Sequence, residues 1–223
     1  MEWVRPAGRT DVRALTTARF DGDLAVDDPD GGLAARRSTI TGLPWSWLRQ
    51  VHGSAVVTVG DDPVEGIEAD ALVTAMAGRV LAIQTADCGP VALVSREGPV
   101  GAVHAGWRGV EAGVLPAAVA ALRSLGATDV EAWLGPCIGP RAYEFGAVDL
   151  DRLVDRFGAN LRAVTDAGTP ALDLRAAIRA SLAEVDVVLV DSAVPCTATE
   201  TRYFSHRARG EAERHALVVW IEP

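Results

Sequence analysis

Two histidines and a cysteine stand at the ends of short apolar runs in the middle of the chain. The segment 80–109 contains three Val-rich runs of strand length, and Cys88 and His104 lie at the ends of two of them. His52 closes an earlier run and is followed by Gly53. Such polar groups are uncommon in an apolar core. Their placement at strand ends therefore indicates a functional site held by a rigid framework.

One thiolate and two imidazoles form a borderline-soft donor set that suits zinc, with copper as the second choice. His52, Cys88 and His104 would leave one position of a tetrahedral ion open, which is typical of catalytic sites. Their wide spacing differs from the compact CxxC pattern of a zinc finger. The sequence is therefore also compatible with Cys88 packed as a small hydrophobe beside unrelated imidazoles.

A second interpretation uses the same atoms without a metal. Cys88 would be a thiolate nucleophile and His104 its base, oriented by Asp87 or by a backbone carbonyl. Asp87 directly precedes Cys88, and a Gly-Pro pair then turns the chain sharply. The residues alone leave both interpretations open.

Three arginines, Arg49, Arg108 and Arg207, each lie close in sequence to a histidine. A guanidinium fork suits phosphate or carboxylate. The segment 104–109 leads toward an expected helix start and contains two glycines, so its backbone N–H groups are further candidates to face an anion. Surface ion pairs are the alternative in so acidic a chain.

Trp107 and Tyr143 are candidates to stack on a base, although core packing is the commoner use of a single aromatic ring. Cys137 lies in the turn-rich segment 135–140 and is expected to be a structural residue of a tight loop. His215 adjoins the charged stretch 211–214 and is expected to be exposed to solvent.

The chain of 223 residues is long enough to bury a substantial core and most simply forms one domain spanning 1–223. Its hydrophobic content of 49% argues against disorder, and no apolar run reaches membrane-spanning length. The N-terminus has no apolar signal core, so a cytoplasmic location is expected. Cys88, Cys137 and Cys196 are then free thiols or metal ligands.

The net charge of −9 disfavours binding to a nucleic-acid polymer, although a local basic pocket for one phosphate stays compatible with it. A small-molecule substrate is expected, with no nucleic-acid or membrane partner. The chain is expected to act as a monomer or a homodimer.

The elements that would position these residues mix strands and helices without strict alternation. Apolar spacing predicts strands at 12–20, 45–52, 55–59, 69–74, 80–83, 91–94, 100–103, 130–134, 185–190 and 216–221, and helices at 33–41, 110–125, 150–157 and 174–183. Pro116 marks either the first turn of a helix or a kink, Asp173 is a helix cap, and 60–66 is a polar turn. The strand at 185–190 is expected to be buried on both faces. An α/β (α+β) fold of mixed β-sheets covered by helices is therefore predicted.

Six motifs occur in an order that resembles the YfiH family, also called the laccase-domain or polyphenol-oxidase family. They are RQVHG at 49–53, ADALVT at 69–74, TADCGP at 85–90, HAGWRG at 104–109, GPCIGP at 135–140 with Tyr143 and Glu144, and FSHR at 204–207. Any one of them is a weak signal, but six in order over most of the chain are specific.

The resemblance implies a single α/β domain of mixed sheets with a zinc site at His52, Cys88 and His104. It also implies phosphorolysis of adenosine, inosine and methylthioadenosine, and hydrolytic deamination of adenosine. Some relatives are linked instead to amide cleavage in a cell-wall (muropeptide) precursor, which suits Cys88 with His104 or the same zinc. The older family name reflects copper-dependent oxidation of phenols, yet four histidines are fewer than a multicopper laccase site needs.

For the phosphorolysis that the resemblance implies, Arg49 and Arg108 are expected to hold inorganic phosphate against the ribose C1′, with Asp87 assisting the departing base. Trp107 or Tyr143 would stack on the purine.

Two positions depart from the family pattern. Gly89 replaces a larger apolar residue, which is expected to open the pocket beside Cys88. The tail after Arg207 lacks the usual Asp-Gly and Thr-Gly-Arg sequences, so substrate contacts are not expected to be supplied by it in the usual way.

Overall fold

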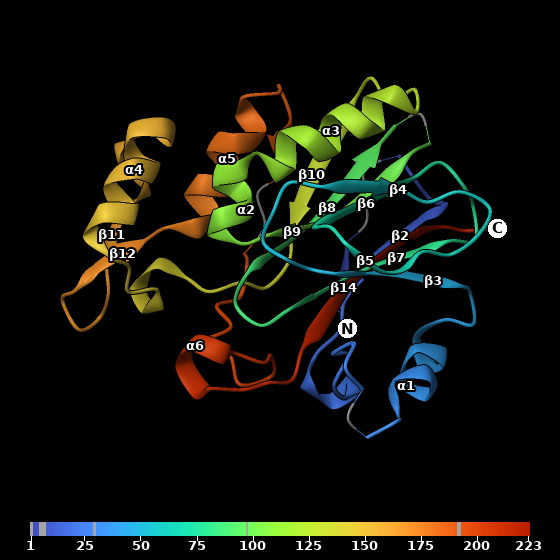
Figure 1. The fold of residues 1–223 in the computed structure, drawn as a ribbon, viewed down its shortest axis with the longest axis horizontal. Coiled ribbons are helices and arrows are strands. Elements are labelled where there is room, and N and C mark those ends of the chain that lie inside the picture. The colour runs from blue at the N-terminus through green and yellow to red at the C-terminus, as the bar shows by residue number, and fades with distance from the viewer. Residues whose placement is uncertain (1, 5–7, 29, 97, 191–192) are drawn as a thin grey trace.

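Two six-stranded sheets pack face to face in the computed structural model of the protein, which describes residues 2–4, 8–28, 30–96, 98–190 and 193–223 (Figure 1). The first sheet consists, in spatial order, of β1 (Glu2–Val4), β2 (Val12–Thr16), β14 (His215–Ile221), β7 (Val80–Thr85), β3 (Trp45–Arg49) and β5 (Glu65–Glu68). The second consists of β13 (Val188–Leu189), β10 (Val130–Leu134), β8 (Gly89–Ser95), β9 (Val100–Ala105), β6 (Ala71–Thr74) and β4 (Val56–Thr58).

Helices cover the outer face of each sheet. Four of them, α2 (Trp107–Ala112), α3 (Val114–Ser124), α4 (Ala147–Phe157) and α5 (Leu174–Ala183), lie on the side of the second sheet, and α1 (Leu33–Ile40) lies beyond the first (Figure 1). The described residues also form the short helix α6 (His206–Arg209) and the hairpin of β11 (Arg162–Val164) and β12 (Pro170–Leu172). Three single-turn 3₁₀ helices lie at Arg19–Asp21, Pro140–Ala142 and Ala159–Leu161. The predicted α/β fold of mixed sheets covered by helices is confirmed.

The strand β14 shows how the sequence builds these layers. Leu217, Val219 and Ile221 pack between the two sheets, whereas the alternate residues Ala216, Val218 and Trp220 pack on the side of α1. Successive side chains of a strand point to opposite faces, so a continuous apolar run suits a strand that is covered on both sides.

Three connections pass from the first sheet to the second at the same end. β3 runs parallel to both of its neighbours, β5 and β7. In the chain, β3 is followed by β4, β5 by β6 and β7 by β8, and these three following strands all belong to the second sheet. The end of β9 lies at the same edge, because Gly89 and Pro90 at the start of β8 pair with Ala105 and His104. This arrangement brings distant parts of the sequence together.

Several predicted elements differ from the structure in detail. The helix expected over 110–125 is divided into α2 and α3 by Gly113, whose φ is +87°, and Pro116 lies in the first turn of α3. The expected turn at 60–66 runs into the edge strand β5. The prediction that 185–190 is buried on both faces is wrong, since β13 is a two-residue edge strand with Val188 68% exposed.

Other expectations are met. Asp173 caps α5, where its carboxylate accepts a hydrogen bond from the Ala176 backbone N–H. All three cysteines are free, and Cys137 is buried in its loop, with its backbone paired to that of Cys196. Within the described residues, no helix has the length and hydropathy needed to cross a membrane.

His215 is buried at the start of β14, so the expectation that it is exposed is wrong. Its Nε2 lies 3.0 Å from the Thr85 hydroxyl, and its ring lies 5.4 Å from that of Tyr203. The charged residues 211–214 precede the strand, whereas residue 215 is already part of it. Burial lowers the pKa of His215 to about 4.

This buried imidazole should make stability depend on pH. His215 stays neutral in the folded protein down to about pH 4, whereas an unfolded histidine binds a proton near pH 6.5, so stability should fall as the pH drops through this range. Between pH 7 and pH 4.5 we expect the free energy of unfolding to fall by about 2.5 kcal/mol because of this group, a loss that should be absent in His215→Gln. Urea unfolding from pH 7 to pH 4.5 measures it, with the exposed His206→Gln as control. Equal pH dependence of wild type and His215→Gln would contradict the assignment.

Candidate metal centre and pocket

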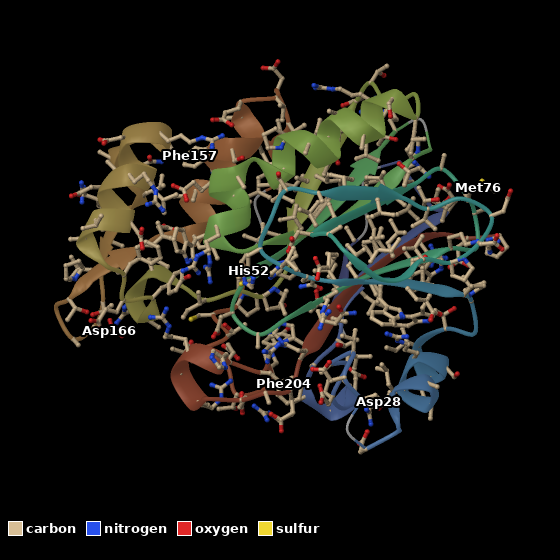
Figure 2. All side chains as sticks on the ribbon, in the orientation of Figure 1. Asp28, His52, Met76, Phe157, Asp166 and Phe204 are labelled. Atoms are coloured by element: carbon tan, nitrogen blue, oxygen red, sulfur yellow. The ribbon has the colours of Figure 1, made fainter. Side chains whose placement is uncertain are left out.

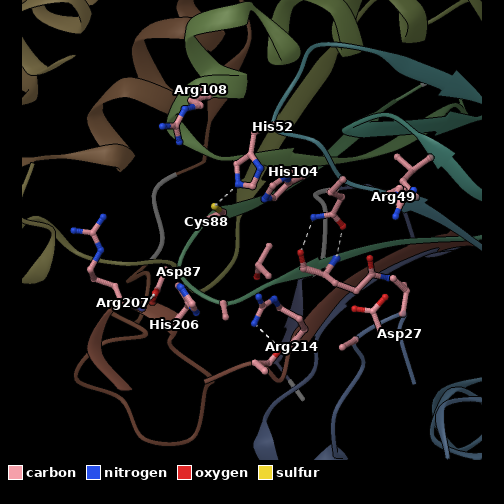
Figure 3. Close-up of a pocket in the computed structure, with 18 of the residues that line it drawn as sticks. Asp27, Arg49, His52, Asp87, Cys88, His104, Arg108, His206, Arg207 and Arg214 are labelled. Atoms are coloured by element: carbon pink, nitrogen blue, oxygen red, sulfur yellow. Dashed lines mark hydrogen bonds between the residues drawn. The ribbon is translucent and has the colours of Figure 1, made fainter. Parts of the chain in front are cut away.

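The three predicted metal ligands meet at the end of the sandwich where the chain passes between sheets. His52 follows β3, Cys88 precedes β8, and His104 is the penultimate residue of β9. Cys88 Sγ lies 3.7 Å from His52 Nε2, and the two imidazole centroids are 4.7 Å apart (Figure 3). One ligand atom of each residue lies within 4.8 Å of the other two, and no second cluster of this kind occurs in the described ranges.

A buried carboxylate holds both histidines. Asp70 Oδ1 lies 2.8 Å from His104 Nδ1, which leaves Nε2 of that ring as the nitrogen available to a ligand. The same carboxylate accepts hydrogen bonds from the backbone N–H groups of residues 51–53 at 2.7–3.3 Å. The interpretation of Asp87 as the carboxylate that orients His104 is therefore wrong, because Asp70 occupies that position.

The backbone of His52 depends on this carboxylate. Its φ of +60° lies in the left-handed region, which costs a non-glycine residue about 1–2 kcal/mol. The conformation turns three successive N–H groups of residues 51–53 toward Asp70, as in other backbone nests that bind anions. The imidazole of His52 is itself exposed, so its position is set through its backbone.

The ionisation of the cluster favours a thiolate. Burial by itself raises the pKa of Cys88, but the charge of His104 and hydrogen bonds from both histidines outweigh it and lower that pKa to about 6. Burial likewise opposes protonation of His104, whereas Cys88 and Asp70 raise its pKa to about 9. Near neutral pH the metal-free site is therefore a thiolate–imidazolium pair, and metal binding must release the imidazolium proton.

The donor atoms fit a tetrahedral ion. A tetrahedral zinc ion with sulfur at about 2.3 Å and nitrogen at about 2.0 Å would hold those two atoms about 3.5 Å apart. The separation of 3.7 Å between Cys88 Sγ and His52 Nε2 is about 0.2 Å longer than this value. His104 is buried, Cys88 half-buried and His52 exposed, so the cluster is open to solvent on the side of His52.

The absence of a side chain at Gly106 lets His52 and Cys88 approach each other. A Cβ at this position would stand 2.8 Å from His52 Cδ2 and 3.0 Å from Cys88 Sγ. By contrast, a Cβ at Gly89 would stand 2.5 Å from Ile178 Cδ1, on the core side. The expectation that Gly89 opens the pocket beside Cys88 is therefore wrong, because its missing side chain makes room for the helix α5.

A pocket of about 650 Å³ extends from the cluster to solvent (Figure 3). This volume lies within the range of about 300–1,000 Å³ typical of small-molecule sites. Besides the cluster, its charged or titratable lining residues are Asp27, Arg49, Asp87, Arg108, Tyr143, His206, Arg207 and Arg214. Four arginines against two carboxylates give a local positive charge in a chain whose net charge is −9.

Arg49 and Arg108 both line this pocket but lie on opposite sides of the cluster (Figure 3). Arg49 lies beyond His104, is 74% exposed and pairs with Glu68 at 3.8 Å. Arg108 lies on the other side, with its guanidinium 4.3 Å from the centroid of the Trp107 ring. The structure therefore does not bring the two predicted phosphate ligands together.

Trp107 and Tyr143 also line the pocket and are connected through a third ring. Phe145 stands edge to face with both, at centroid distances of 5.2 Å to Trp107 and 5.5 Å to Tyr143. Tyr143 is buried, and the guanidinium of Arg207 lies 5.1 Å from its centroid. Both rings thus contact arginine side chains. That Trp107 or Tyr143 stacks on a purine stays a prediction.

Asp87 fastens the C-terminal segment to the turn that carries Cys88. Its Oδ1 accepts hydrogen bonds from the hydroxyls of Thr197 and Ser205 at 2.6 and 2.7 Å, and its Oδ2 accepts one from the Arg207 backbone N–H at 2.6 Å. Its φ of +98° is again in the left-handed region. A role of Asp87 in assisting a departing base stays a prediction.

Asp70 is the site residue that the sequence analysis missed. The signal was present in the motif ADALVT, where one acidic residue interrupts an otherwise apolar run. A charge in such a place has to be paired or hydrogen-bonded, which marks it as a candidate partner of a buried imidazole.

Comparison with known proteins agrees with the geometry. The model of the multi-copper polyphenol oxidoreductase laccase family matches residues 14–222, so the chain belongs to this family, and the resemblance to YfiH is confirmed. A purine nucleoside phosphorylase of Xylella fastidiosa (strain Temecula1) is 42% identical, over 99% of this chain and 95% of its own length.

Two further relatives support the same assignment of family and fold. Purine nucleoside phosphorylase YfiH of Escherichia coli K12 is 37% identical, over 78% of this chain and 73% of its own length. The crystal structure of Neisseria meningitidis protein NMB0706 has a TM-score of 0.85 at 27% identity, and the match covers 100% of this chain and 99% of that one.

The position of Asp70 predicts the effect of replacing it. Asp70→Asn places an amide N–H₂ group among four N–H donors, so it should loosen both histidines and weaken metal binding about 10- to 100-fold. Competition for zinc with a chromogenic chelator measures the affinity, and circular dichroism checks the fold. The exposed Asp62→Asn is the matched control. Unchanged zinc affinity in Asp70→Asn would show that this carboxylate does not position the ligands.

Proposed function

We propose that the protein is a metal-dependent purine nucleoside phosphorylase that acts on adenosine, inosine and methylthioadenosine and also deaminates adenosine. The observation that carries the proposal is the placement of a His-Cys-His cluster inside an arginine-lined pocket. Relatives that are 37–42% identical and are named purine nucleoside phosphorylases support the same substrate class. Inorganic phosphate is then the second substrate.

Phosphorolysis places defined demands on such a pocket. A phosphate oxygen forms a bond to the ribose C1′ while the bond from C1′ to N9 of the purine breaks. The electron pair of that bond leaves with the base, which takes up a proton, and the products are the free base and ribose 1-phosphate. The site must therefore hold an anion against C1′ and supply a polar group near the purine. Deamination instead exchanges the amino group at C6 for the oxygen of a water molecule and releases ammonia.

His52, Cys88 and His104 would hold the metal ion. When bound, such an ion supplies Lewis-acid chemistry by lowering the pKa of a water molecule or polarising a substrate oxygen. Zinc is preferred over copper, because blue-copper His₂Cys sites usually add a methionine at long distance. Met76 is the one methionine within the described ranges, and it lies far from His52 (Figure 2).

The chain's own residues supply binding and orientation. Asp70 holds the two histidines, and Arg108 places a positive charge beside the cluster for the phosphate. Asp87 is proposed to assist the departing base, and Trp107 or Tyr143 to contact the purine. Arg49 is proposed to contact the substrate on the opposite side of the pocket.

Amide hydrolysis in a cell-wall precursor is the second candidate, and one observation favours it. Cys88, His104 and Asp70 form a chain of thiol, imidazole and carboxylate, which is the arrangement that activates a cysteine nucleophile. Such a hydrolase would need neither phosphate nor a nucleoside.

A substrate panel on metal-loaded and metal-stripped protein separates these functions. We expect adenosine to release adenine only when phosphate is present, ammonia to be released with or without phosphate, and both reactions to require the metal. Cys88→Ser should lose more than about 100-fold of both activities together with the bound metal, because it removes the thiolate ligand. Cys196→Ser is the matched thiol control.

Two outcomes would contradict the proposal. If Cys88→Ser keeps its phosphorolysis, the metal centre is not the reactive site. If every nucleoside is inert while a muropeptide amide is cleaved, the protein is the hydrolase of the second candidate.

A further inference from the structure

Two arginines of the pocket have no carboxylate partner within the part of the chain that the structure describes. Arg49 pairs with Glu68, and Arg214 donates to the backbone carbonyls of residues 211–213. With the described residues, Arg108 makes no ion pair, and the guanidinium of Arg207 makes one hydrogen bond, to the Glu144 carbonyl. In a chain with 30 acidic and 21 basic residues, unpaired guanidinium groups in a pocket favour an anion that comes from outside the protein.

A row of three aromatic rings supports both cations. The guanidinium of Arg108 lies against Trp107 and that of Arg207 against Tyr143, and Phe145 joins the two rings edge to face. Cation–π contacts of this kind orient a guanidinium while its N–H groups stay available to a ligand. Trp107 and Tyr143 therefore act as platforms for the arginines.

The backbone of Arg207 is fixed from the opposite side. Its N–H donates to Asp87 Oδ2 at 2.6 Å, directly beside Cys88 in the sequence. The same carboxylate holds Ser205, whose hydroxyl accepts a hydrogen bond from the Ala208 N–H at the start of α6. Whatever contact Asp87 makes with a substrate, its carboxylate also ties the segment carrying Arg207 to the turn carrying the thiol.

We propose that Arg108 and Arg207 form an anion subsite for inorganic phosphate, and that Arg49 is not part of it. The two arginines lie on the Cys88 side of the cluster, whereas Arg49 lies beyond His104 (Figure 3). Arg108, Arg207 and the three residues of the cluster line one pocket, so a phosphate held by the two arginines would share that pocket with the cluster. The assignment rests on the proposed phosphorylase function and names the residues that bind its second substrate.

Direct binding tests the subsite without turnover. Inorganic phosphate and, separately, AMP are titrated calorimetrically into metal-loaded wild type, Arg108→Gln, Arg207→Gln, Arg207→Lys and Arg49→Gln. Arg141→Gln is the matched control, because this exposed arginine pairs with Asp166 near the same loop. Metal content and melting temperature verify that each variant is folded and loaded.

We expect Arg108→Gln and Arg207→Gln each to weaken phosphate binding about 10- to 100-fold, because each removes a charge-assisted contact. Arg207→Lys should lose less, since it keeps the charge but not the fork. Arg141→Gln should bind phosphate like the wild type. The KM for phosphate should rise in the two glutamine variants by the same factors.

Phosphate affinity within twofold of wild type in Arg207→Gln, or a larger loss in Arg49→Gln, would overturn the assignment. So would a result in which only AMP binding depends on Arg108 and Arg207, since the subsite would then take the phosphate of a nucleotide. Arginine-dependent phosphate binding without base release in the wild type would refute the phosphorylase and keep the subsite. If base release depends on phosphate but is unchanged in Arg108→Gln and Arg207→Gln, the subsite is refuted and the phosphorylase function is kept.

Discussion

A single buried carboxylate, that of Asp70, connects the two histidines of the candidate metal cluster. Removing such a charge from water costs several kcal/mol unless donors surround it. Here three backbone N–H groups and one imidazole surround it, so the loop after β3 and the end of β9 are held by the same group. The left-handed backbone of His52 persists because this carboxylate accepts the N–H groups it exposes.

The convergence of the ligands follows from topology. Three parallel strands of the first sheet each pass to the second sheet at one end, and these connections carry His52, Asp70 and Cys88. His104 reaches the same edge because β9 runs antiparallel to β8 and pairs with its first residues. Strand ends in two packed sheets are rigid, so the donor atoms are preorganised without a compact sequence motif.

The charges of the pocket divide into two groups. Arg49 and Arg214 are engaged by the protein itself, whereas Arg108 and Arg207 rest on aromatic rings with their N–H groups largely uncommitted. The net negative charge of the chain disfavours the binding of long polyanions. The arginines of the pocket place positive charge where a small anion can reach the cluster.

Residue type and placement at strand ends were sufficient to predict that His52, Cys88 and His104 cluster, and to predict the mixed-sheet fold. They could not identify Asp70, because its role depends on donors from two other segments that only the folded chain brings to it. The same limit explains the errors at Asp87 and Gly89, whose neighbours come from the C-terminal segment and from α5. His215 was misplaced because nearby charges in sequence do not show where a strand begins.

Proximity in sequence likewise could not rank the arginines. Arg49 and Arg108 both lie near histidines, yet the first has a carboxylate partner and the second has an aromatic platform. The ion pair of Arg49 with Glu68 forms because β3 and β5 are neighbours in the sheet. The sequence around Arg49 alone does not reveal which strand lies beside it.

The central claim is that His52, Cys88 and His104 bind one metal ion together. X-ray absorption at the zinc edge of the loaded protein measures this directly. We expect one sulfur at about 2.3 Å and two imidazole nitrogens at about 2.0 Å from the zinc ion, with the sulfur shell missing in Cys88→Ser. A shell of nitrogen and oxygen alone in the wild type, or a sulfur shell that survives in Cys88→Ser, would contradict it.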